Sequence, residues 1–522
     1  MIGRLIDRLM GLPQARTDAV TVTRNLRVPM PDGTLLLADR YRPQGVAGPL
    51  PVVLIRTPYG RANLESRLLG GALSRQGFQV VAQSVRGTFG SGGTFMPFAQ
   101  ERADGLATAA WLRAQPWCDG RLATAGNSYG GYTQWALGPY LEQPLSAMCL
   151  GITASGLVNT FYPGGTLALH NLLGWSSLIT VQESAPLGAP ISPLYHRKVE
   201  RAKRHLPLAT ADLAAVGRPS AFFRDVVDHD RAFWAESDHS PAAAGLTTPA
   251  SMVSGWYDIF LPETIADFAA GRNNRITIGP WGHDAGAIRA GLIDAVSWLR
   301  AHLMDDGAQL RRAPVRLHLQ NARQWLDFDS WPPPATPTTL HLGPRGGLGW
   351  EATGEPGHDS FVHDPADPAP TVGGPLLGGK GGQRDQRELE RRRDVLVYTS
   401  APLPRDLDLV GPVTARVAVR TDTGFGDLFV RLCDVDQAGL SRNVTDGVLR
   451  LAPDDDEVTV ELFPTGYRFL RGHRLRVQVS GACFPRFARN HGTGEPAASA
   501  VAGKRVSYEI GHTSALTLPV LT

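Results

Sequence analysis

A serine flanked by glycines stands near the centre of the segment 122–131, LATAGNSYGG. The small residues before it are typical of a buried strand, and GNSYG (126–130) matches the G-x-S-x-G pattern of a strand–turn–helix nucleophile elbow. In such a turn the serine hydroxyl projects outward, and side chains at the flanking glycines would collide with the neighbouring strand and helix. Because a chain with 58 glycines can match this pattern by chance, the alternative is a solvated serine in a glycine-rich turn. Ser128 is therefore a candidate nucleophile that needs partners.

A serine hydroxyl becomes a good nucleophile when a base takes its proton and a carboxylate holds that base. In doubly wound hydrolases these groups follow in the order Ser, Asp or Glu, then His. Asp258 and His283 each follow an apolar run typical of a strand, at the sheet edge where such partners lie. Taken alone, Asp258 could cap the next helix and His283 could be an ordinary loop histidine. Three placements in the expected order predict a catalytic triad of Ser128, Asp258 and His283.

A tetrahedral oxyanion needs hydrogen-bond donors aimed at it. The backbone N–H of Tyr129, directly after the serine, is the first expected donor. The second normally comes from the loop after an early strand, where this chain has Tyr59 rather than a glycine run. We expect the Tyr59 hydroxyl to be that donor, with an aromatic plug between loops as the alternative.

The elements that position these residues alternate along the first part of the chain. Short apolar runs at 51–55, 78–82, 122–126, 147–152, 250–255 and 275–279 are separated by helical stretches, which predicts a mainly parallel sheet with helices on both faces. A helical, aromatic-rich segment interrupts this rhythm and predicts a lid. Beyond residue 313, alternating strands such as 315–319 and 413–419 lie between Gly/Pro/Asp-rich loops, which predicts a jelly roll.

The predicted architecture therefore has three parts. We expect an α/β-hydrolase catalytic domain at 1–155 and 246–312, a helical cap at 156–245, and a C-terminal jelly-roll β-sandwich at 313–522. The tract 347–383 is rich in Gly, Pro and Asp and is expected to be a long ordered loop that wraps the other domains, with a mobile linker as the alternative. The jelly roll is expected to pack on the catalytic domain and to help close the pocket.

Composition excludes several function classes. The net charge is +3 with both signs mixed along the chain, which gives no case for a nucleic-acid partner. The cysteines lack CxxC spacing, so neither a zinc site nor a disulfide framework is expected, and no metal or cofactor is called for. We find no secretory signal and no apolar run of about 18 residues, so no membrane partner and a cytoplasmic location are expected. A homodimer is compatible with the sequence, which does not fix the oligomeric state. The cysteines are Cys118, Cys149, Cys433 and Cys483.

The chain resembles the X-Pro dipeptidyl-peptidase/cocaine-esterase family of serine hydrolases in blocks that follow one another along nearly its whole length. This resemblance implies an α/β-hydrolase domain with a helical cap and a C-terminal jelly roll. It also implies the triad Ser128, Asp258 and His283, with Tyr59 and the Tyr129 amide as oxyanion donors. The blocks include RTPYGR (56–61), VRGTFGSGG (85–93), the segment 104–132 that contains the elbow, SGWYDIF (254–260), GPWGH (279–283), RFLRGHRLRV (468–477) and CFPRFARNHGTG (483–494).

One departure from the family bears on specificity. Members that hydrolyse α-amino acid esters carry carboxylates just after the triad aspartate, whereas Ile259, Phe260 and Leu261 follow Asp258 here. An apolar wall cannot pair a cation, so an uncharged acyl group is expected, with Phe260 and Trp175 lining its pocket.

The predicted function is that of a serine acyl hydrolase, most simply a carboxylesterase, which cleaves a small-molecule ester through an acyl-enzyme. A rival function is that of an X-Pro dipeptidyl-peptidase or amidase, which needs an anionic anchor for a free amino terminus. The cap could supply this anchor from Glu183, Glu200 or Asp225. The sequence is also compatible with an acyltransferase, in which an acceptor besides water takes the acyl group, and with a binding protein without catalysis on the same scaffold.

Overall fold

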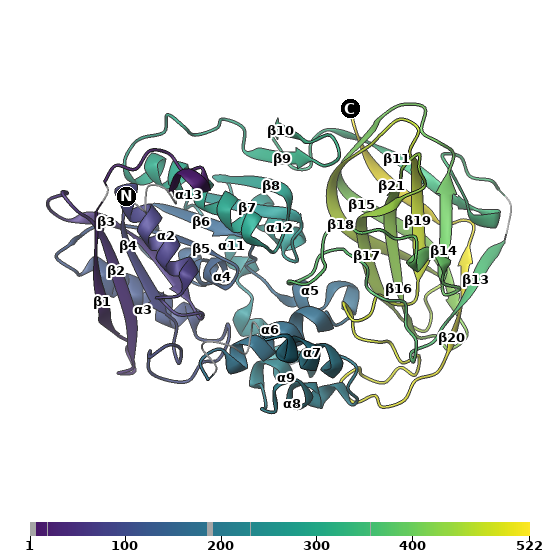
Figure 1. Cartoon of the computed structure of the whole chain (residues 1–522), viewed down its shortest axis with the longest axis horizontal. Coiled ribbons are helices and arrows are strands. Elements are labelled where there is room, and N and C mark those ends of the chain that lie inside the picture. Colours follow the sequence, from purple (N-terminus) through teal and green to yellow (C-terminus); the bar gives the residue numbers. More distant parts are fainter. Residues whose placement is uncertain (1–6, 18, 185–191, 230, 355–356) are drawn as a thin grey trace.

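The computed structural model describes residues 7–17, 19–184, 192–229, 231–354 and 357–522. Two bodies rich in strands lie side by side, and a group of helices spans the gap between them at one end (Figure 1). The N-terminal body is a twisted sheet with helices on both faces, and the C-terminal body is built from strands.

Among the described residues, the N-terminal sheet has ten strands in the order β1-β2-β4-β3-β5-β6-β7-β8-β9-β10. Neighbouring strands from β4 to β9 run parallel, and antiparallel strands close each edge. Every residue of β4, β6 and β7 is buried, as expected for apolar runs that helices cover on both faces. The strands are β1 (Val20–Pro29), β2 (Leu35–Pro43), β3 (Leu50–Thr57), β4 (Gln79–Ser84), β5 (Cys118–Asn127), β6 (Ala147–Gly151), β7 (Ala250–Tyr257), β8 (Asn274–Gly282), β9 (Val315–Leu319) and β10 (Gln324–Phe328).

Helices cover this sheet in two layers. One core joins the sheet to residues from α3 (Glu101–Arg113), α4 (Tyr129–Trp135) and α12 (Leu261–Ala270). A second core on the opposite face contains residues from α2 (Leu64–Arg75) and α13 (Ala285–Leu303). The parallel strands consequently end at one common edge, where ligands of such sheets bind.

The strand expected at 315–319 belongs to the N-terminal sheet and not to the C-terminal one. Strand β9 was expected to begin the jelly roll, but β9 pairs in parallel with β8 and β10 pairs with β9, so both extend the N-terminal sheet. The alternating burial of β9 is that of a strand near a sheet edge. Alternation shows that a strand has two different faces, but it cannot show which sheet the strand joins.

Seven α-helices lie in the described part of the segment between β6 and β7, which we call the cap. Its buried side chains form an aromatic-rich core with residues of the elbow helix α4, including Tyr129 and Tyr132. The cap is therefore packed directly above the carboxyl edge of the sheet. Its helices are α5 (Val158–Phe161), α6 (Leu169–Val181), α7 (Pro193–Ala202), α8 (Ala211–Val216), α9 (Ala221–Val227), α10 (Arg231–Ser237) and α11 (Ser240–Ala243).

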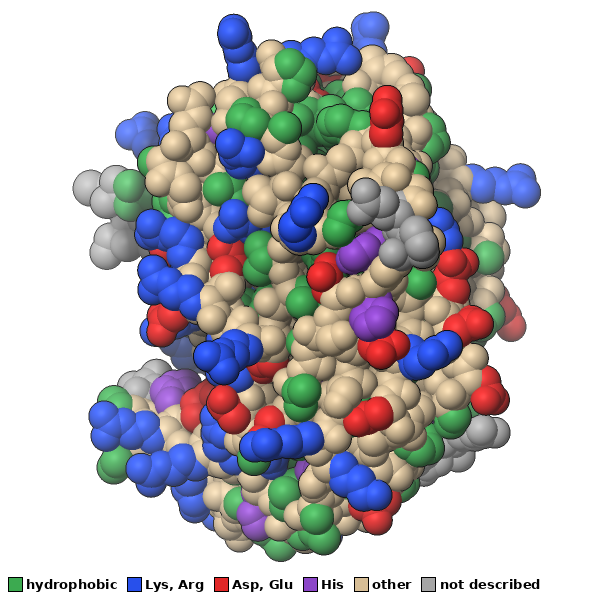
Figure 2. Space-filling view, turned by 90° about the vertical axis from the view of Figure 1, so that its right-hand side faces the viewer, with side chains coloured by type: hydrophobic (Ala, Val, Ile, Leu, Met, Phe, Trp, Pro, Cys, Tyr) green, Lys and Arg blue, Asp and Glu red, His purple; other side chains and the backbone are tan. Residues whose placement is uncertain are grey.

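The C-terminal strands β11 to β21 form what we call the β domain, with its own apolar core. The last strand returns to pair with the first, β11 with β21, and β13 pairs with β20. On the outer face of this domain, acidic and basic side chains are interspersed (Figure 2). The strands are β11 (Ala335–Gly343), β12 (Gly347–Gly349), β13 (His358–His363), β14 (Val395–Ser400), β15 (Leu407–Thr421), β16 (Gly426–Val435), β17 (Ser441–Leu451), β18 (Glu457–Phe469), β19 (Arg474–Ser480), β20 (Val506–Gly511) and β21 (Ala515–Leu521).

The β domain docks on the N-terminal sheet through β18. The backbone of Gln320, just past β9, exchanges hydrogen bonds with Gly466 and Arg468 of β18 at 2.9 and 3.1 Å. Beside this contact the buried Trp256 of β7 packs so closely on Gly466 that a Cβ there would lie 2.5 Å from the indole ring. A glycine is therefore required where the two domains meet.

The glycine-rich tract 347–383 is partly regular. It includes β12 and β13, and its later part lies against the cap, where the backbone N–H of Leu377 donates a hydrogen bond of 3.1 Å to Asn171. The expected long loop is therefore shorter than predicted, and residues 355–356 of the tract lie outside the described part of the chain.

Two further sequence expectations concern helices and thiols. No helix in the described part of the chain is both long and apolar enough to cross a membrane. The four cysteines are buried, and none forms a disulfide.

Candidate active site

Ser128 stands at a sharp turn between β5 and α4. Its backbone has φ 54° and ψ −121°, a strained conformation for a residue with a side chain. The predicted crowding is confirmed at Gly126, where a Cβ would lie 2.7 Å from the carbonyl oxygen of Gly130. At Gly130 the nearest atom would be 3.3 Å away, and the tighter position is Gly131, where a Cβ would lie 2.4 Å from Thr153. The glycines of this segment thus allow the turn that presents the serine.

The three predicted triad residues meet at the carboxyl edge of the sheet. His283 Nε2 lies 3.1 Å from Ser128 Oγ, and His283 Nδ1 lies 2.9 Å from Asp258 Oδ1. The Asp258 side chain is fully buried and that of His283 is 10% exposed. The carboxylate can therefore fix the imidazole with Nε2 directed at the serine, while the histidine stays within reach of a substrate.

Sequence reasoning missed the group that holds the other carboxylate oxygen. Ser254 Oγ donates a hydrogen bond of 2.9 Å to Asp258 Oδ2, and the Asp258 N–H donates to the carbonyl of Gly255. Because β7 is wholly buried, an Asp258 oxygen without a donor would be costly. The sequence does place a serine four residues before the aspartate. A serine in a strand can have many other roles, however, so its position alone does not predict this hydrogen bond.

Tyr59 lies just past β3 with its hydroxyl group at the active site. The indole N–H of Trp175 donates a hydrogen bond of 2.8 Å to Tyr59 Oη, so the phenolic hydrogen is directed elsewhere. Burial raises the pKa of Tyr59 to about 12, and hydrogen bonds from Trp175 and with Ser128 oppose this rise. Tyr59 is therefore a neutral donor beside the serine. The N–H of Tyr129 opens α4, where the helix itself supplies no acceptor.

A narrow apolar cavity, which we call the acyl cavity, opens beside Ser128. Trp175 and Phe260 both line it, as predicted, and the Phe260 ring lies 5.6 Å from the imidazole of His283. Its volume is about 30 Å³, so a bound acyl group must push its rings apart. The other lining residues are Tyr59, Phe98, Tyr129, Tyr132, Thr153, Leu157, Phe161, Asn171, Ile259 and Leu377.

Phe98 is a further wall of this cavity that sequence reasoning missed. Its ring stacks on Tyr129 at 4.6 Å and on Trp175 at 5.3 Å, and its backbone N–H donates to Tyr129 Oη. The Tyr129 hydroxyl in turn donates a hydrogen bond of 2.7 Å to the buried carboxylate of Glu101. These bonds fix the aromatic ring of Tyr129, whose backbone N–H is the expected oxyanion donor.

The three cap carboxylates expected as anchors for a free amino terminus do not line the acyl cavity. Glu200 pairs with Lys203, Asp225 lines a separate cavity, and Glu183 is exposed at the end of α6. A carboxylate that does lie near the acyl cavity is Glu263 of α12. This residue lines a cavity of about 590 Å³ that shares two wall residues, Asn171 and Ile259, with the acyl cavity. Burial raises the pKa of Glu263 to about 8.

Ser128 stands at a strained elbow and is hydrogen-bonded to His283, which the buried Asp258 orients. This site lies on a parallel sheet beneath a helical cap. Together these features define a serine hydrolase of the α/β-hydrolase fold. Comparisons with known proteins place the chain within that class. Residues 32–285 match the X-Pro dipeptidyl-peptidase (S15) family, and residues 307–514 match the C-terminal non-catalytic domain of X-Pro dipeptidyl-peptidases. The chain belongs to this family.

Individual relatives cover nearly the whole chain. Cocaine esterase of Rhodococcus sp. (strain MB1 Bresler) is 32% identical over 96% of this chain and 99% of its own. Two solved structures share the fold: an aminopeptidase from a Thaumarchaeota archaeon (23% identity, TM-score 0.82) and an α-amino acid ester hydrolase (21% identity, TM-score 0.82). Each alignment covers 98% of both chains.

Proposed function

We propose that the protein hydrolyses carboxylic esters of uncharged acyl groups through an acyl-enzyme. The observation that carries this proposal is the hydrogen-bonded chain from Ser128 through His283 to Asp258, placed beside an apolar cavity. The likeness to cocaine esterase, 32% identical over nearly the full length, supports an ester as the substrate.

The geometry suggests a role for each group. Ser128 Oγ attacks the carbonyl carbon while His283 Nε2 takes its proton, and Asp258 stabilises the imidazolium that forms. The oxyanion accepts hydrogen bonds from the Tyr59 hydroxyl and the Tyr129 N–H. His283 then gives its proton to the leaving alcohol, and water, activated by the same histidine, releases the acid.

The wall of the acyl cavity supports an uncharged acyl group. In the described residues that line it, aromatic and aliphatic side chains dominate and no side chain is charged. A cation or anion transferred into this cavity would lose its hydration without gaining a partner. An acyl group with an aromatic ring could instead stack on Trp175 or Phe260.

One observation favours a second candidate, peptidase or amidase activity on a substrate with a free amino terminus. Glu263 lies in the cavity next to the acyl cavity, and its Oε2 is buried without a hydrogen-bond partner among the described residues. An ammonium group that reached Glu263 would favour the ionised carboxylate and could be held there.

A paired turnover assay distinguishes ester hydrolysis from peptidase or amidase activity. Wild type and Ser128→Ala are compared on a p-nitrophenyl ester of an uncharged acid and on Gly-Pro p-nitroanilide. The expected result is ester turnover that Ser128→Ala abolishes, with the anilide untouched. Turnover of the anilide by the wild type, lost in Glu263→Gln, would favour the peptidase. If the wild type turns over neither the ester nor the anilide, the proposal is contradicted.

A further inference from the structure

Two adjacent residues of the β domain, Leu376 and Leu377, lie between the acyl cavity and a second cavity on the other side of the triad. Leu377 lines the acyl cavity together with Ser128, whereas Leu376 lines the second cavity together with His283. The second cavity has a volume of about 420 Å³. Because His283 gives its proton to the departing oxygen, the leaving group must lie on the histidine side of the scissile bond. This second cavity is therefore placed to hold the alcohol portion, and we call it the alcohol cavity.

Polar groups dominate the wall of the alcohol cavity, in contrast to the acyl cavity. His318 Nδ1 is buried and has no hydrogen-bond partner in the described part of the chain, and the Tyr257 hydroxyl lies beside the Gln383 amide. Burial lowers the pKa of His318, which favours the neutral ring, and a neutral ring can bind without adding charge. The wall also includes Gln320, Asn321, Arg384, and Gly378, Gly379, Gly381 and Gly382. An alcohol with polar groups of its own suits this wall better than a hydrocarbon.

One basic and one acidic side chain line this cavity, Arg384 and Asp284. They differ in how many hydrogen bonds and opposite charges each already has. The Asp284 carboxylate accepts backbone hydrogen bonds of 2.9 Å from Gly282 and 2.8 Å from Gly286 at the start of α13, where the helix dipole offsets its charge. The Arg384 guanidinium donates only to the carbonyl of Lys380, at 3.3 Å, and pairs with no carboxylate among the described residues. The uncompensated charge facing the cavity is therefore positive.

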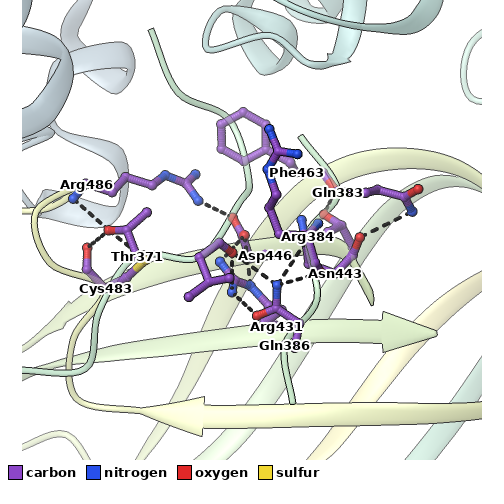
Figure 3. Close-up of polar contacts among 12 residues, drawn as sticks. Thr371, Gln383, Arg384, Gln386, Arg431, Asn443, Asp446, Phe463, Cys483 and Arg486 are labelled. Carbon is purple, nitrogen blue, oxygen red and sulfur yellow. Dashed lines mark hydrogen bonds and ion pairs between the residues drawn. The ribbon is translucent and has the colours of Figure 1, made fainter. Parts of the chain in front are cut away.

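The backbone that carries Arg384 is held by a buried polar network (Figure 3). Asn443 of β17 accepts a hydrogen bond of 2.7 Å from the Arg384 N–H and donates one of 3.1 Å to the Gly382 carbonyl. Beneath it, Asp446 binds both Arg431 and Arg486. Burial alone would raise the pKa of Asp446, but the two guanidinium groups hold it below its usual value.

The same network requires a glycine at position 374, just before this part of the wall. A Cβ at Gly374 would lie 2.8 Å from both the Arg486 guanidinium and the Asp446 carboxylate. The loop can therefore lie directly on the charged cluster, and its position is fixed before a ligand arrives. A fixed backbone lowers the cost of binding a ligand through Arg384.

We propose that the alcohol cavity selects esters whose alcohol portion carries a carboxylate, which pairs with Arg384. This inference rests on the proposed ester hydrolysis and names its leaving group. In the reaction, Ser128 Oγ bonds to the acyl carbon and the bond to the alcohol oxygen breaks. The serine proton passes through His283 to that oxygen, and the carboxylate remains unchanged throughout.

A matched pair of esters tests this inference: 4-carboxyphenyl butyrate and the uncharged 4-carbamoylphenyl butyrate, with each rate divided by its rate of alkaline hydrolysis. The quantity measured is the ratio of kcat/KM for the charged ester to kcat/KM for the neutral one. Because Arg384 is exposed, we expect Arg384→Gln to lower this ratio by about fivefold to tenfold. Arg384→Lys keeps the charge and should retain part of the preference.

Arg387→Gln is the matched control, since Arg387 lies three residues away, is exposed and pairs with Asp385 outside the cavity wall. Its ratio should equal that of the wild type. The preference should also shrink as salt is added. An unchanged ratio in Arg384→Gln overturns this inference but leaves ester hydrolysis intact. If neither ester shows turnover that depends on Ser128, the proposed function fails and the inference fails with it.

Discussion

Trp175 of the cap donates its indole hydrogen to the oxygen of Tyr59 at 2.8 Å, which links the wall of the acyl cavity to the proposed oxyanion donor. Because the Tyr59 oxygen accepts this bond, its own hydrogen can point at the oxyanion. We expect Trp175→Phe, which keeps an aromatic ring but removes the donor, to lower kcat about tenfold with a smaller effect on KM. Removing the Tyr59 donor itself by Tyr59→Phe should cost about 100-fold.

The double variant separates orientation from packing. If Trp175 acts through Tyr59, Trp175→Phe should add little to the loss in Tyr59→Phe, because the two residues work as one unit. Turnover of a p-nitrophenyl ester gives kcat for the wild type, the two single variants and the double variant. Losses that multiply in the double variant would show that Trp175 is only a wall of the cavity.

Ser254 is expected to be a positioning residue for the triad. Ser254→Ala leaves Asp258 Oδ2 buried without the hydrogen bond of 2.9 Å that it now accepts. Leaving a buried acceptor unsatisfied costs about 1–3 kcal/mol, so we expect kcat to fall about 5- to 150-fold while KM changes little. Ser254→Thr keeps the hydroxyl and should recover part of the activity. A parallel rise in KM, or an unchanged kcat, would contradict this role.

The sequence was sufficient to predict that Ser128, Asp258 and His283 meet, because each of them follows a strand that ends at the same sheet edge. Chain order and strand ends are local signals, so Ser128, Asp258 and His283 could be placed without tertiary contacts. The bond from Ser254 to Asp258 and the stacking of Phe98 on Tyr129 depend on side-chain orientation, which periodicity does not report.

The fold shows the same limit at larger scale. The alternation of β9 correctly predicted a strand, but its partner is β8 of the first sheet, and this choice depends on how the chain returns after α13. Arg384 lies far from the triad in sequence and reaches the alcohol cavity only because the β domain folds back against β7 and β8. A linear pattern carries no information on such long-range packing.

Glu263 is expected to make stability depend on pH. Burial raises its pKa from 4.5 in the unfolded chain to about 8 in the folded one, so between these values the folded state holds a proton that the unfolded state has lost. Stability contributed by this group is full below pH 4.5 and is lost as the pH rises toward 8. The slope is at most about 1.4 kcal/mol per pH unit.

Glu263→Gln removes this titration. The Tm of the variant relative to wild type should therefore increase steadily from pH 5 to pH 8, measured by differential scanning fluorimetry in buffers of equal ionic strength. Asp267, whose burial raises its pKa to about 7, remains in both proteins, and its charge is one cause of the raised Glu263 pKa. A constant difference in Tm across this range would show that Glu263 does not change its charge on unfolding.

Removing the β domain is expected to destroy the enzyme. A chain that ends at residue 331 keeps β9 and β10. It exposes Trp256, which is only 2% exposed in the full chain, and it removes Leu377 from the wall of the acyl cavity. A chain that ends at residue 312 also loses two strands of the first sheet. We expect both to be insoluble or inactive in expression and ester-hydrolysis assays. Soluble, fully active protein from either truncation would show that the β domain does not help form the site.

Phe98 and Phe222 form a partition at the far end of the acyl cavity. Their ring centroids lie 5.5 Å apart, and Phe222 also packs edge-on against Trp175 at 5.0 Å. Phe98 lines the acyl cavity, whereas Phe222 lines a separate cavity of about 260 Å³ behind it. Shortening Phe222 should join the two spaces. We expect Phe222→Ala to raise the ratio of kcat/KM for p-nitrophenyl octanoate over butyrate by at least about tenfold, since burying even two of the four extra methylenes at about 0.8 kcal/mol each corresponds to about that ratio.

Deleting a buried ring costs about 3–5 kcal/mol of stability, so the milder Phe222→Leu is made in parallel and both are checked by thermal unfolding. Phe233→Leu is the control, because Phe233 lines only the rear cavity and does not separate it from the acyl cavity. Its octanoate-to-butyrate ratio should match that of the wild type. Folded Phe222 variants with an unchanged ratio would mean that the two cavities stay closed to each other, and that acyl length is limited by Phe98 alone.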